Sequence, residues 1–116
     1  MAASFSVLAS GSAANSVYIS GLKTRILIDC GLSAKQTELR LAQIGVDPQS
    51  IDAIVVSHEH SDHVKGIPVF AKRYGTKIHM NRATFDACSA MQKVPIGSLC
   101  FFETGKLFDL GDLSLD

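Results

Sequence analysis

The stretch that decides the fold is "IDAIVVSHEHSDHVKG", residues 51–66. Its first part, residues 51–57, is rich in β-branched and small apolar residues and predicts a largely buried strand. Residues 58–63 then hold three of the four histidines of the chain within six positions. Alternate residues of an extended segment point to the same side, so His58 and His60 can direct their imidazoles toward one point.

The residues that follow, Asp62 and His63, come after Ser61, where a turn would aim them at a second point nearby. Imidazole nitrogen and carboxylate oxygen suit zinc, iron or manganese, and two metal ions about 3.5–4 Å apart form a hydrolytic site. The alternative is a solvent-exposed polar loop in which the histidines coincide by chance. Burying these side chains without a metal would be costly, so they are either liganded or exposed. Their position directly after a buried strand favours a metal site.

The segments before residue 51 predict an antiparallel meander and then a helix. Strand-forming residues separated by small or turn-forming ones predict strands over 5–9, 16–20 and 24–29. Ser33, followed three residues later by Gln36, predicts a capping box at the start of a helix. That helix is expected to end at Gly45, since Pro48 lies just beyond it.

The segments after the histidine cluster predict alternating helices and strands. An apolar stripe at helical spacing, ended by a glycine, is formed by Ile67, Phe70, Ala71, Tyr74 and Gly75. A short strand is expected over 77–80, and Asn81 is expected to cap a helix. The apolar face of that helix would consist of Ala87, Ala90, Met91 and Val94. Further strands over 98–102 and 107–115 complete an α/β fold, in which helices pack on a mixed sheet.

Composition excludes several classes of protein. Hydrophobic residues make up 47% of the 116 residues, too many for a disordered chain. Eleven basic residues balance eleven acidic ones, so net charge indicates neither nucleic acid nor a membrane surface as the partner. We expect no signal peptide and no membrane span. The number of cysteines is odd, and no CxxC pair occurs among Cys30, Cys88 and Cys100. This pattern favours small buried thiols in a reduced, cytoplasmic setting.

The sequence "SHEHSDH" resembles the HxHxDH signature of metallo-β-lactamase-fold hydrolases. The resemblance implies that His58 and His60 bind one metal ion. It implies that Asp62 and His63 bind the second, and that Asp62 also positions the nucleophilic water. The fold it implies is an αβ/βα sandwich.

An upstream aspartate of the same family matches Asp29 in "RILIDCG". The resemblance implies that Asp29 supports the ligand loop through hydrogen bonds. The alternative is a simple turn residue before Gly31.

Longer stretches, "LASGSAANSVYI", "LIDCGLSAKQTELRLAQIGVDPQSIDAIVVSHEHSDHVKGI" and "RYGTKIHM", resemble the YycJ/WalJ-type branch of this family. That branch implies a cytoplasmic bacterial DNA exonuclease that acts from a 5′ end, with Ser10, Ser12 and Asn15 bordering the metal site. The chain departs from the SGSxGNS pattern of the branch because Ala14 replaces its glycine. If that position requires a positive φ, alanine costs about 1 kcal/mol.

The predicted site is incomplete. Two catalytic metal ions need about six ligand positions, some of them shared, and the motif supplies four. His79 alternates with apolar neighbours and is expected to be a half-buried strand residue rather than a ligand. The resemblance implies that the other ligands follow residue 116, so residues 1–116 are expected to be the N-terminal half of the domain, truncated at the C-terminus.

Two functions of different classes follow. In the first, the complete protein is a two-metal phosphodiesterase that degrades DNA. In the second, the chain is an inactive module that binds metal weakly or associates with itself through an open sheet edge. Another hydrolase on the same scaffold, acting on thioesters or lactams, is the enzymatic alternative. Four basic residues lie close together in the sequence: Lys65, Lys72, Arg73 and Lys77. Either they contact the DNA backbone, or they form an ordinary solvated surface.

Overall fold

The computed structural model describes residues 4–10, 14–21, 23–57, 64–87, 94, 96–102, 108–110 and 113–115. Its main sheet has the strand order β1-β2-β3-β4-β5-β6. The first three strands run antiparallel, and β3 to β6 run parallel to one another. The predicted α/β class with a mixed sheet is therefore confirmed. The strands are β1 (Ser4–Ala9), β2 (Ser16–Ser20), β3 (Arg25–Ile28), β4 (Ala53–Val55), β5 (Lys77–Met80) and β6 (Leu99–Phe101).

The helix α1 (Ala34–Gln43) begins and ends where its local signals predict. The Ser33 side chain accepts a hydrogen bond from the Gln36 backbone N–H at 3.2 Å, which satisfies one of the free donors of the first turn. Gly45 follows the helix with φ 74°, a conformation that glycine adopts without a Cβ clash. A short 3₁₀ turn, η1 (Pro48–Ser50), then leads into β4.

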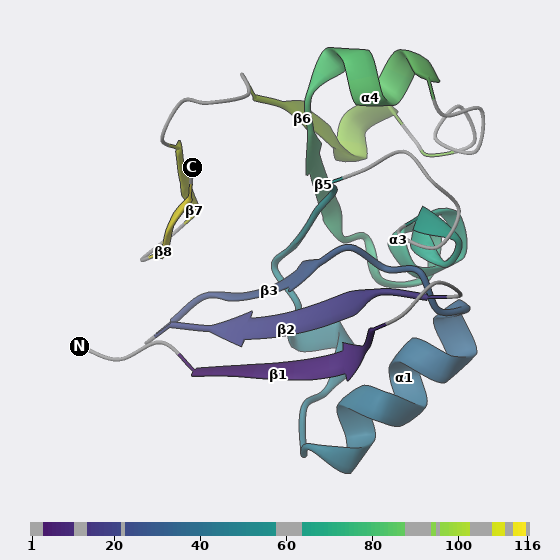
Figure 1. Ribbon diagram of the computed structural model, residues 1–116, viewed down its shortest axis with the longest axis vertical. Coiled ribbons are helices and arrows are strands. Elements are labelled where there is room, and N and C mark those ends of the chain that lie inside the picture. Colours follow the sequence, from purple (N-terminus) through teal and green to yellow (C-terminus); the bar gives the residue numbers. More distant parts are fainter. Residues whose placement is uncertain are drawn as a thin grey trace.

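The helix α3 (Ile67–Tyr74) also matches its predicted stripe. Ile67, Phe70 and Ala71 are buried, Tyr74 is half-buried, and Gly75 ends the helix with φ 65°. Figure 1 shows α1 and α3 on the same face of the sheet. The main core lies between them and the sheet, and its largest fully buried side chains include Phe70, Leu27, Leu41, Ile54 and Ile78.

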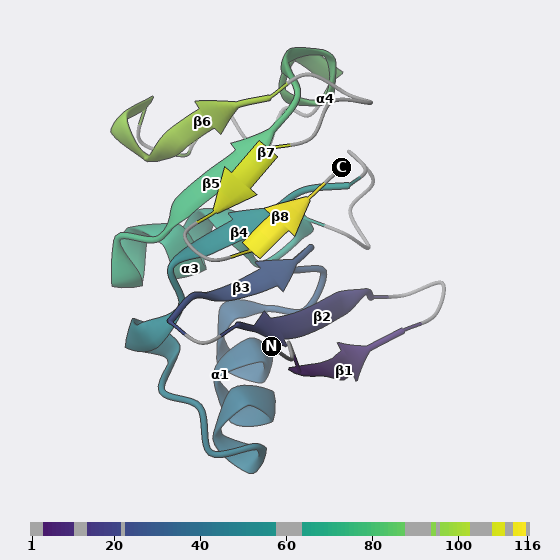
Figure 2. The same ribbon diagram turned by 90° about the vertical axis from the view of Figure 1, so that its left-hand side faces the viewer.

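The opposite face of the sheet carries a smaller apolar cluster. Ile26, Ala53 and Val55 are buried there. The antiparallel hairpin of β7 (Phe108–Leu110) and β8 (Leu113–Leu115) lies over this face, where Figure 2 shows it in front of the central strands. On β1, Phe5 and Val7 pair with residues of this same face, yet they are 71% and 56% exposed.

Two predicted elements differ in detail. Strand β4 is shorter than the predicted 51–57, and a 3₁₀ turn precedes it. Before the strand, the Asp52 N–H donates to the Arg25 carbonyl at 2.8 Å, and the Asp52 carboxylate accepts from the Arg25 N–H at 2.9 Å. Helix α4 (Arg82–Ala87) has its predicted cap, since the Asn81 side chain accepts from the Thr84 N–H at 2.7 Å.

The apolar face predicted for α4 is wrong at Ala87, which is exposed. The buried residue of the helix is Thr84, and Phe85 packs against the main core. Ala90 and Met91 lie outside the described residues, and Val94 is buried beyond the described part of the helix. Another 3₁₀ turn, η3 (Ile96–Ser98), precedes β6. No helix in the described part of the chain is long and apolar enough to cross a membrane.

Candidate metal centre

The carboxyl ends of β3 and β4 are neighbours, because the strands are parallel and Ile28 pairs with Val55. Asp29 follows β3 directly, and Ser57 follows β4 after one further residue. The four predicted ligands, His58, His60, Asp62 and His63, come next in the chain and lie outside the described residues. What the structure describes is therefore how the chain enters and leaves this HxHxDH segment, residues 58–63.

The entry to the HxHxDH segment is held by Asp29. Its Oδ1 accepts a hydrogen bond from the Ser57 N–H at 2.7 Å, and its Oδ2 accepts one from the Ser57 hydroxyl at 2.5 Å. Asp29 is only 4% exposed, and its own N–H donates to the Val55 carbonyl at 2.7 Å. Hydrogen bonds to a carboxylate are stronger than those between neutral groups, so residue 57 is firmly positioned at the strand end.

The backbone of Asp29 is itself unusual. Its φ of 65° makes it the one non-glycine residue with positive φ among those the structure describes. This left-handed conformation costs roughly 1–2 kcal/mol for most residues and less for Asp or Asn. The Ser16 hydroxyl donates to the Asp29 carbonyl at 3.0 Å, so neighbouring groups stabilise the strained turn. Strain that the surrounding structure maintains in this way is characteristic of functional positions.

The exit from the HxHxDH segment is held by Gly66. Its N–H donates to the Cys30 carbonyl at 2.9 Å, and Val64 just before it is buried. A Cβ atom on Gly66 would lie 2.0 Å from the Leu32 carbonyl oxygen, so only glycine allows this approach. Both ends of the HxHxDH segment are thus connected to one short piece of chain, residues 29–32, which we call the anchor segment.

The donor chemistry fits a metal at residues 58–63 better than at the anchor segment. The Asp29 carboxylate already accepts two hydrogens from Ser57. Burial raises the pKa of the Cys30 thiol to about 11, so at neutral pH it is protonated and is not a thiolate ligand. Elsewhere in the described ranges, no three His, Cys, Asp or Glu side chains gather to hold a metal ion. The imidazoles and carboxylate of the HxHxDH segment are the donors that zinc, manganese or iron would take.

The prediction of small buried thiols holds for Cys30 and only in part for Cys100. Cys30 is fully buried, with its sulfur 3.5 Å from the Thr37 hydroxyl oxygen. Cys100 is half-buried, and both are free. Cys88 lies outside the described residues.

His79 is half-buried in β5, as its alternation with apolar neighbours predicts. Burial, with a smaller contribution from the positive charge of Lys77, lowers the pKa of its imidazole. Its carbonyl oxygen accepts from the Val56 N–H at 2.9 Å, which extends the pairing of β4 and β5.

The loop residues predicted to border the site are only partly described. Ser10 is exposed at the end of β1, and Ser12 lies outside the described residues. The Asn15 carbonyl accepts from the Gly31 N–H at 2.9 Å, which places Asn15 beside the anchor segment. Ala14 does not have a positive φ, so the strain considered for this position is absent.

The predicted basic group divides into two kinds of residue. Arg73 forms an ion pair with Glu38 at 2.6 Å, and the Tyr74 hydroxyl donates to the same carboxylate. These contacts, with Tyr74 contributing most, lower the pKa of Glu38. The Lys77 ammonium donates to the Gly97 carbonyl at 2.8 Å. Arg73 and Lys77 therefore have partners within the fold.

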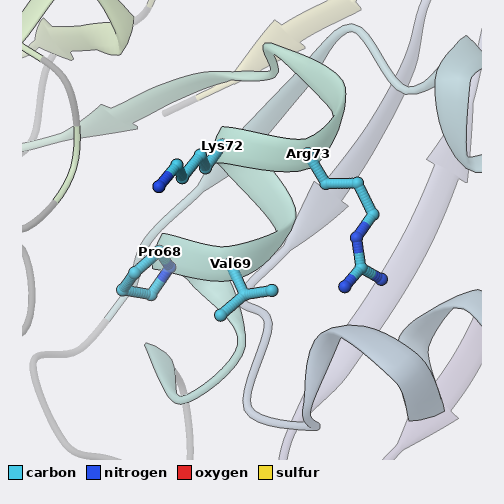
Figure 3. Close-up of a pocket in the computed structure, with 4 residues that line it drawn as sticks. All are labelled: Pro68, Val69, Lys72 and Arg73. Atoms are coloured by element: carbon cyan, nitrogen blue, oxygen red, sulfur yellow. The ribbon is translucent and has the colours of Figure 1, made fainter.

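Lys72 has a different setting. Figure 3 shows Lys72 and Arg73 pointing in different directions from α3, and together with Pro68 and Val69 they line a surface pocket of about 620 Å³. Lys72 and Lys65 are both exposed. They are the members of the group that remain suited to contact a phosphate backbone.

Comparison with known proteins defines the class. The sequence profile of the family described as the metallo-beta-lactamase superfamily matches residues 9–90. The chain therefore belongs to the metallo-β-lactamase superfamily, and the resemblance seen in the HxHxDH motif is confirmed.

Within that family, the chain is similar to particular bacterial nucleases. It is 39% identical over 115 residues to exodeoxyribonuclease WalJ of Streptococcus pneumoniae serotype 2, and the match covers 97% of this chain and 43% of that protein. It is 35% identical over 113 residues to exodeoxyribonuclease YycJ of Bacillus anthracis, with the same coverage. The chain thus spans less than half the length of these relatives.

Solved structures confirm the fold. A B3 metallo-beta-lactamase with an active-site glutamic acid superposes with a TM-score of 0.75 at 21% identity, over 95% of this chain and 47% of that one. The SMB-1 metallo-beta-lactamase gives a TM-score of 0.72 at 21% identity, over 93% and 47%. At this identity the likeness concerns the fold and not the substrate.

Proposed function

We propose that this chain contributes the HxHxDH half of the active site of a metal-dependent hydrolase that degrades DNA from a 5′ end. The observation that carries the proposal is the pair of hydrogen bonds from Ser57 to Asp29, because they fix the backbone directly before His58. The DNA substrate is supported by the similarity to two exodeoxyribonucleases over 97% of the chain. A cytoplasmic location is part of the proposal, in keeping with the free thiols of Cys30 and Cys100.

In this proposal His58 and His60 would hold one divalent ion, and Asp62 and His63 would hold the other. Two such ions, zinc, manganese or iron, would lower the pKa of a bound water and offset the negative charge of a phosphate. Asp62 accepts a hydrogen bond from the attacking water and orients it toward phosphorus. Asp29 and Gly66 act on the same residues indirectly, since they hold the two ends of the segment.

The reaction is hydrolysis of a phosphodiester. The water oxygen forms a bond to phosphorus while the bond from phosphorus to the leaving nucleoside oxygen breaks. One proton of the attacking water ends on the leaving oxygen, so the products are a phosphate monoester and a free hydroxyl. Lys65 and Lys72 are exposed and suit the negatively charged backbone on either side of the scissile bond.

The test compares DNA degradation by the protein with and without its metal ligands. We expect Asp62→Ala to reduce metal-dependent release of nucleotides from end-labelled DNA at least about 100-fold. Glu59→Ala is the matched control, because Glu59 lies between the two histidines at a variable position of the HxHxDH motif. Equal degradation by the protein and its Asp62→Ala variant, or degradation that persists in EDTA, would refute the proposed site.

Self-association is a second candidate function, favoured by the exposed apolar residues of β1. This strand lies at one end of the six-stranded sheet, and Phe5 and Val7 are both more than half exposed. Edge strands with such side chains pair readily with other strands. If β1 mediates association, Val7→Lys will shift a concentration-dependent dimer toward monomer in sedimentation experiments. A monomer at every concentration would exclude this candidate.

A further inference from the structure

A second pocket lies on the described surface, away from the anchor segment. It has a volume of about 230 Å³ and is lined by Arg82, Phe85, Leu99 and Phe101. We call it the aromatic pocket. Its volume is below the roughly 300–1,000 Å³ typical of pockets for drug-sized ligands, so it suits one small group.

The aromatic pocket combines two rings and a guanidinium group. The rings of Phe85 and Phe101 are 5.5 Å apart in an edge-to-face arrangement. The Arg82 guanidinium carbon lies 5.7 Å from the Phe85 ring centroid and 5.3 Å from that of Phe101, within the range of a cation–π interaction.

Phe85 and Leu99 form the inner wall of the pocket, since both pack against the main core, whereas Phe101 and Arg82 remain accessible. Phe101 is 47% exposed, and the Arg82 side chain is 70% exposed. Arg82 also pairs with Asp86 at 3.2 Å, but exposed ion pairs of this kind contribute little and are easily exchanged. The pocket therefore offers a partner both an apolar ring and a planar cation.

The position of the aromatic pocket relates it to the HxHxDH segment. Helix α4 begins just past the end of β5, and Phe101 is the last residue of β6. Strands β4, β5 and β6 are parallel, so these ends lie at the same edge of the sheet as Ser57. Two strand spacings separate β4 from β6, roughly 10 Å. Figure 1 shows α4 and β6 together beside β5.

We propose that the aromatic pocket stacks an unpaired nucleobase of single-stranded DNA. The proposal rests on the proposed function and specifies part of its substrate: a single-stranded portion that runs along this edge of the sheet. Aromatic side chains stack on bases of any sequence because every base has a π face, and arginine adds a cation–π contribution. The planar guanidinium group of Arg82 is suited to both the base and the phosphate next to it.

The test measures binding without cleavage. A fluorescently labelled oligothymidylate is titrated in EDTA, and affinity is followed by fluorescence anisotropy. Phe101→Ala is expected to weaken binding between five- and 150-fold, the range for loss of one stacked base. Arg82→Lys, which keeps the charge but removes the planar group, is expected to weaken binding about two- to fivefold. Leu39→Ala is the control, since Leu39 is an exposed apolar residue on α1, outside both the aromatic pocket and β1, and should leave affinity unchanged.

An abasic oligonucleotide of the same length separates stacking from charge. It keeps the phosphates but lacks bases, so the protein should bind it more weakly and Phe101→Ala should have no further effect. If Phe101→Ala fails to fold, Phe101→Leu keeps apolar packing without a ring, and circular dichroism checks both variants.

The proposal is overturned if the Phe101 and Arg82 variants bind the normal oligonucleotide as tightly as the unaltered protein. The aromatic pocket would then contribute to packing and not to DNA binding. It is also overturned if the abasic strand binds equally well. Either result leaves the Asp62 cleavage test untouched. Failure of that cleavage test would remove the proposed function without changing the binding data.

Discussion

Gly66→Ala tests how closely the exit of the HxHxDH segment must approach the anchor segment. The backbone of Gly66 has φ −88° and ψ −6°, which any residue adopts, so the substitution introduces no left-handed strain. Its whole effect must come from the added methyl group. That atom would lie 2.0 Å from the Leu32 carbonyl oxygen, 3.1 Å from the Cys30 sulfur and 3.2 Å from the Ala34 nitrogen.

The cost follows from these distances. Side-chain Cβ atoms essentially never come closer than 3.0 Å to another heavy atom, so the start of α3 or the Leu32 carbonyl must move by at least about 1 Å. Overpacking of this kind costs roughly 1–3 kcal/mol. Distortion of the Gly66–Cys30 hydrogen bond adds roughly 0.5–1.5 kcal/mol. We therefore expect the free energy of unfolding to fall by about 1.5–4.5 kcal/mol.

Urea unfolding followed by circular dichroism measures this loss. The matched control is Gly97→Ala, because no heavy atom lies within 4 Å of a Cβ built at Gly97 and its φ is not positive. The control should change the free energy of unfolding by less than about 0.5 kcal/mol. If the two alanine variants are equally stable, the close approach at Gly66 does not constrain the fold and the reasoning fails.

Three further predictions concern groups in or beside the core. Thr76→Val should raise the free energy of unfolding by about 1 kcal/mol in thermal or urea unfolding, because the buried Thr76 hydroxyl has no hydrogen-bond partner within the part of the chain that is described. Thr37→Val is the contrasting variant and should lower the free energy of unfolding, since the Thr37 hydroxyl donates to the Ser33 carbonyl at 2.9 Å. Equal changes in the free energy of unfolding of the two variants would contradict this prediction. In the folded protein, iodoacetamide should modify Cys100 much faster than Cys30, because burial raises the pKa of the Cys30 thiol to about 11. Mass spectrometry of the alkylated peptides measures the two rates, and faster modification of Cys30 would contradict this prediction. The pKa of His79 is lowered in the fold from the unfolded value of 6.5, so the unfolded state binds more protons there. Stability should therefore fall as pH drops from 6.5 toward the folded pKa, and a His79→Gln variant that retains the full pH dependence would refute this assignment.

Local signals in the sequence were sufficient for most elements. The ends of α1 and α3 follow from Ser33, Gly45 and Gly75, because caps depend on neighbouring residues alone. The prediction failed at Ala87, where the fold turns Thr84 and Phe85 inward instead, since tertiary packing decides which face of a short helix is buried.

The sequence predicts the residue types of the candidate site, but it does not predict the contacts that hold the HxHxDH segment at its two ends. The HxHxDH spacing and the position of Asp29 are visible in the sequence, whereas the role of Gly66 depends on the Leu32 carbonyl oxygen, 34 positions earlier in the chain. The same is true of Arg73, whose partner Glu38 lies on another helix. Contacts between segments far apart in the sequence need the three-dimensional fold.

The most direct test of the account is the metal affinity of an Asp29→Asn variant. Asparagine tolerates the left-handed backbone of residue 29 but replaces one of the two carboxylate oxygens that accept hydrogens from Ser57. Asp52→Asn is the matched control, because the Asp52 carboxylate also accepts a backbone N–H, that of Arg25 at 2.9 Å, at the start of β4. We predict that calorimetric titration with Mn²⁺ or Zn²⁺ will show affinity reduced by roughly 10–100-fold in Asp29→Asn and unchanged in Asp52→Asn. Equal metal affinity in the two variants would contradict the claim that Asp29 holds the HxHxDH segment in place to bind metal.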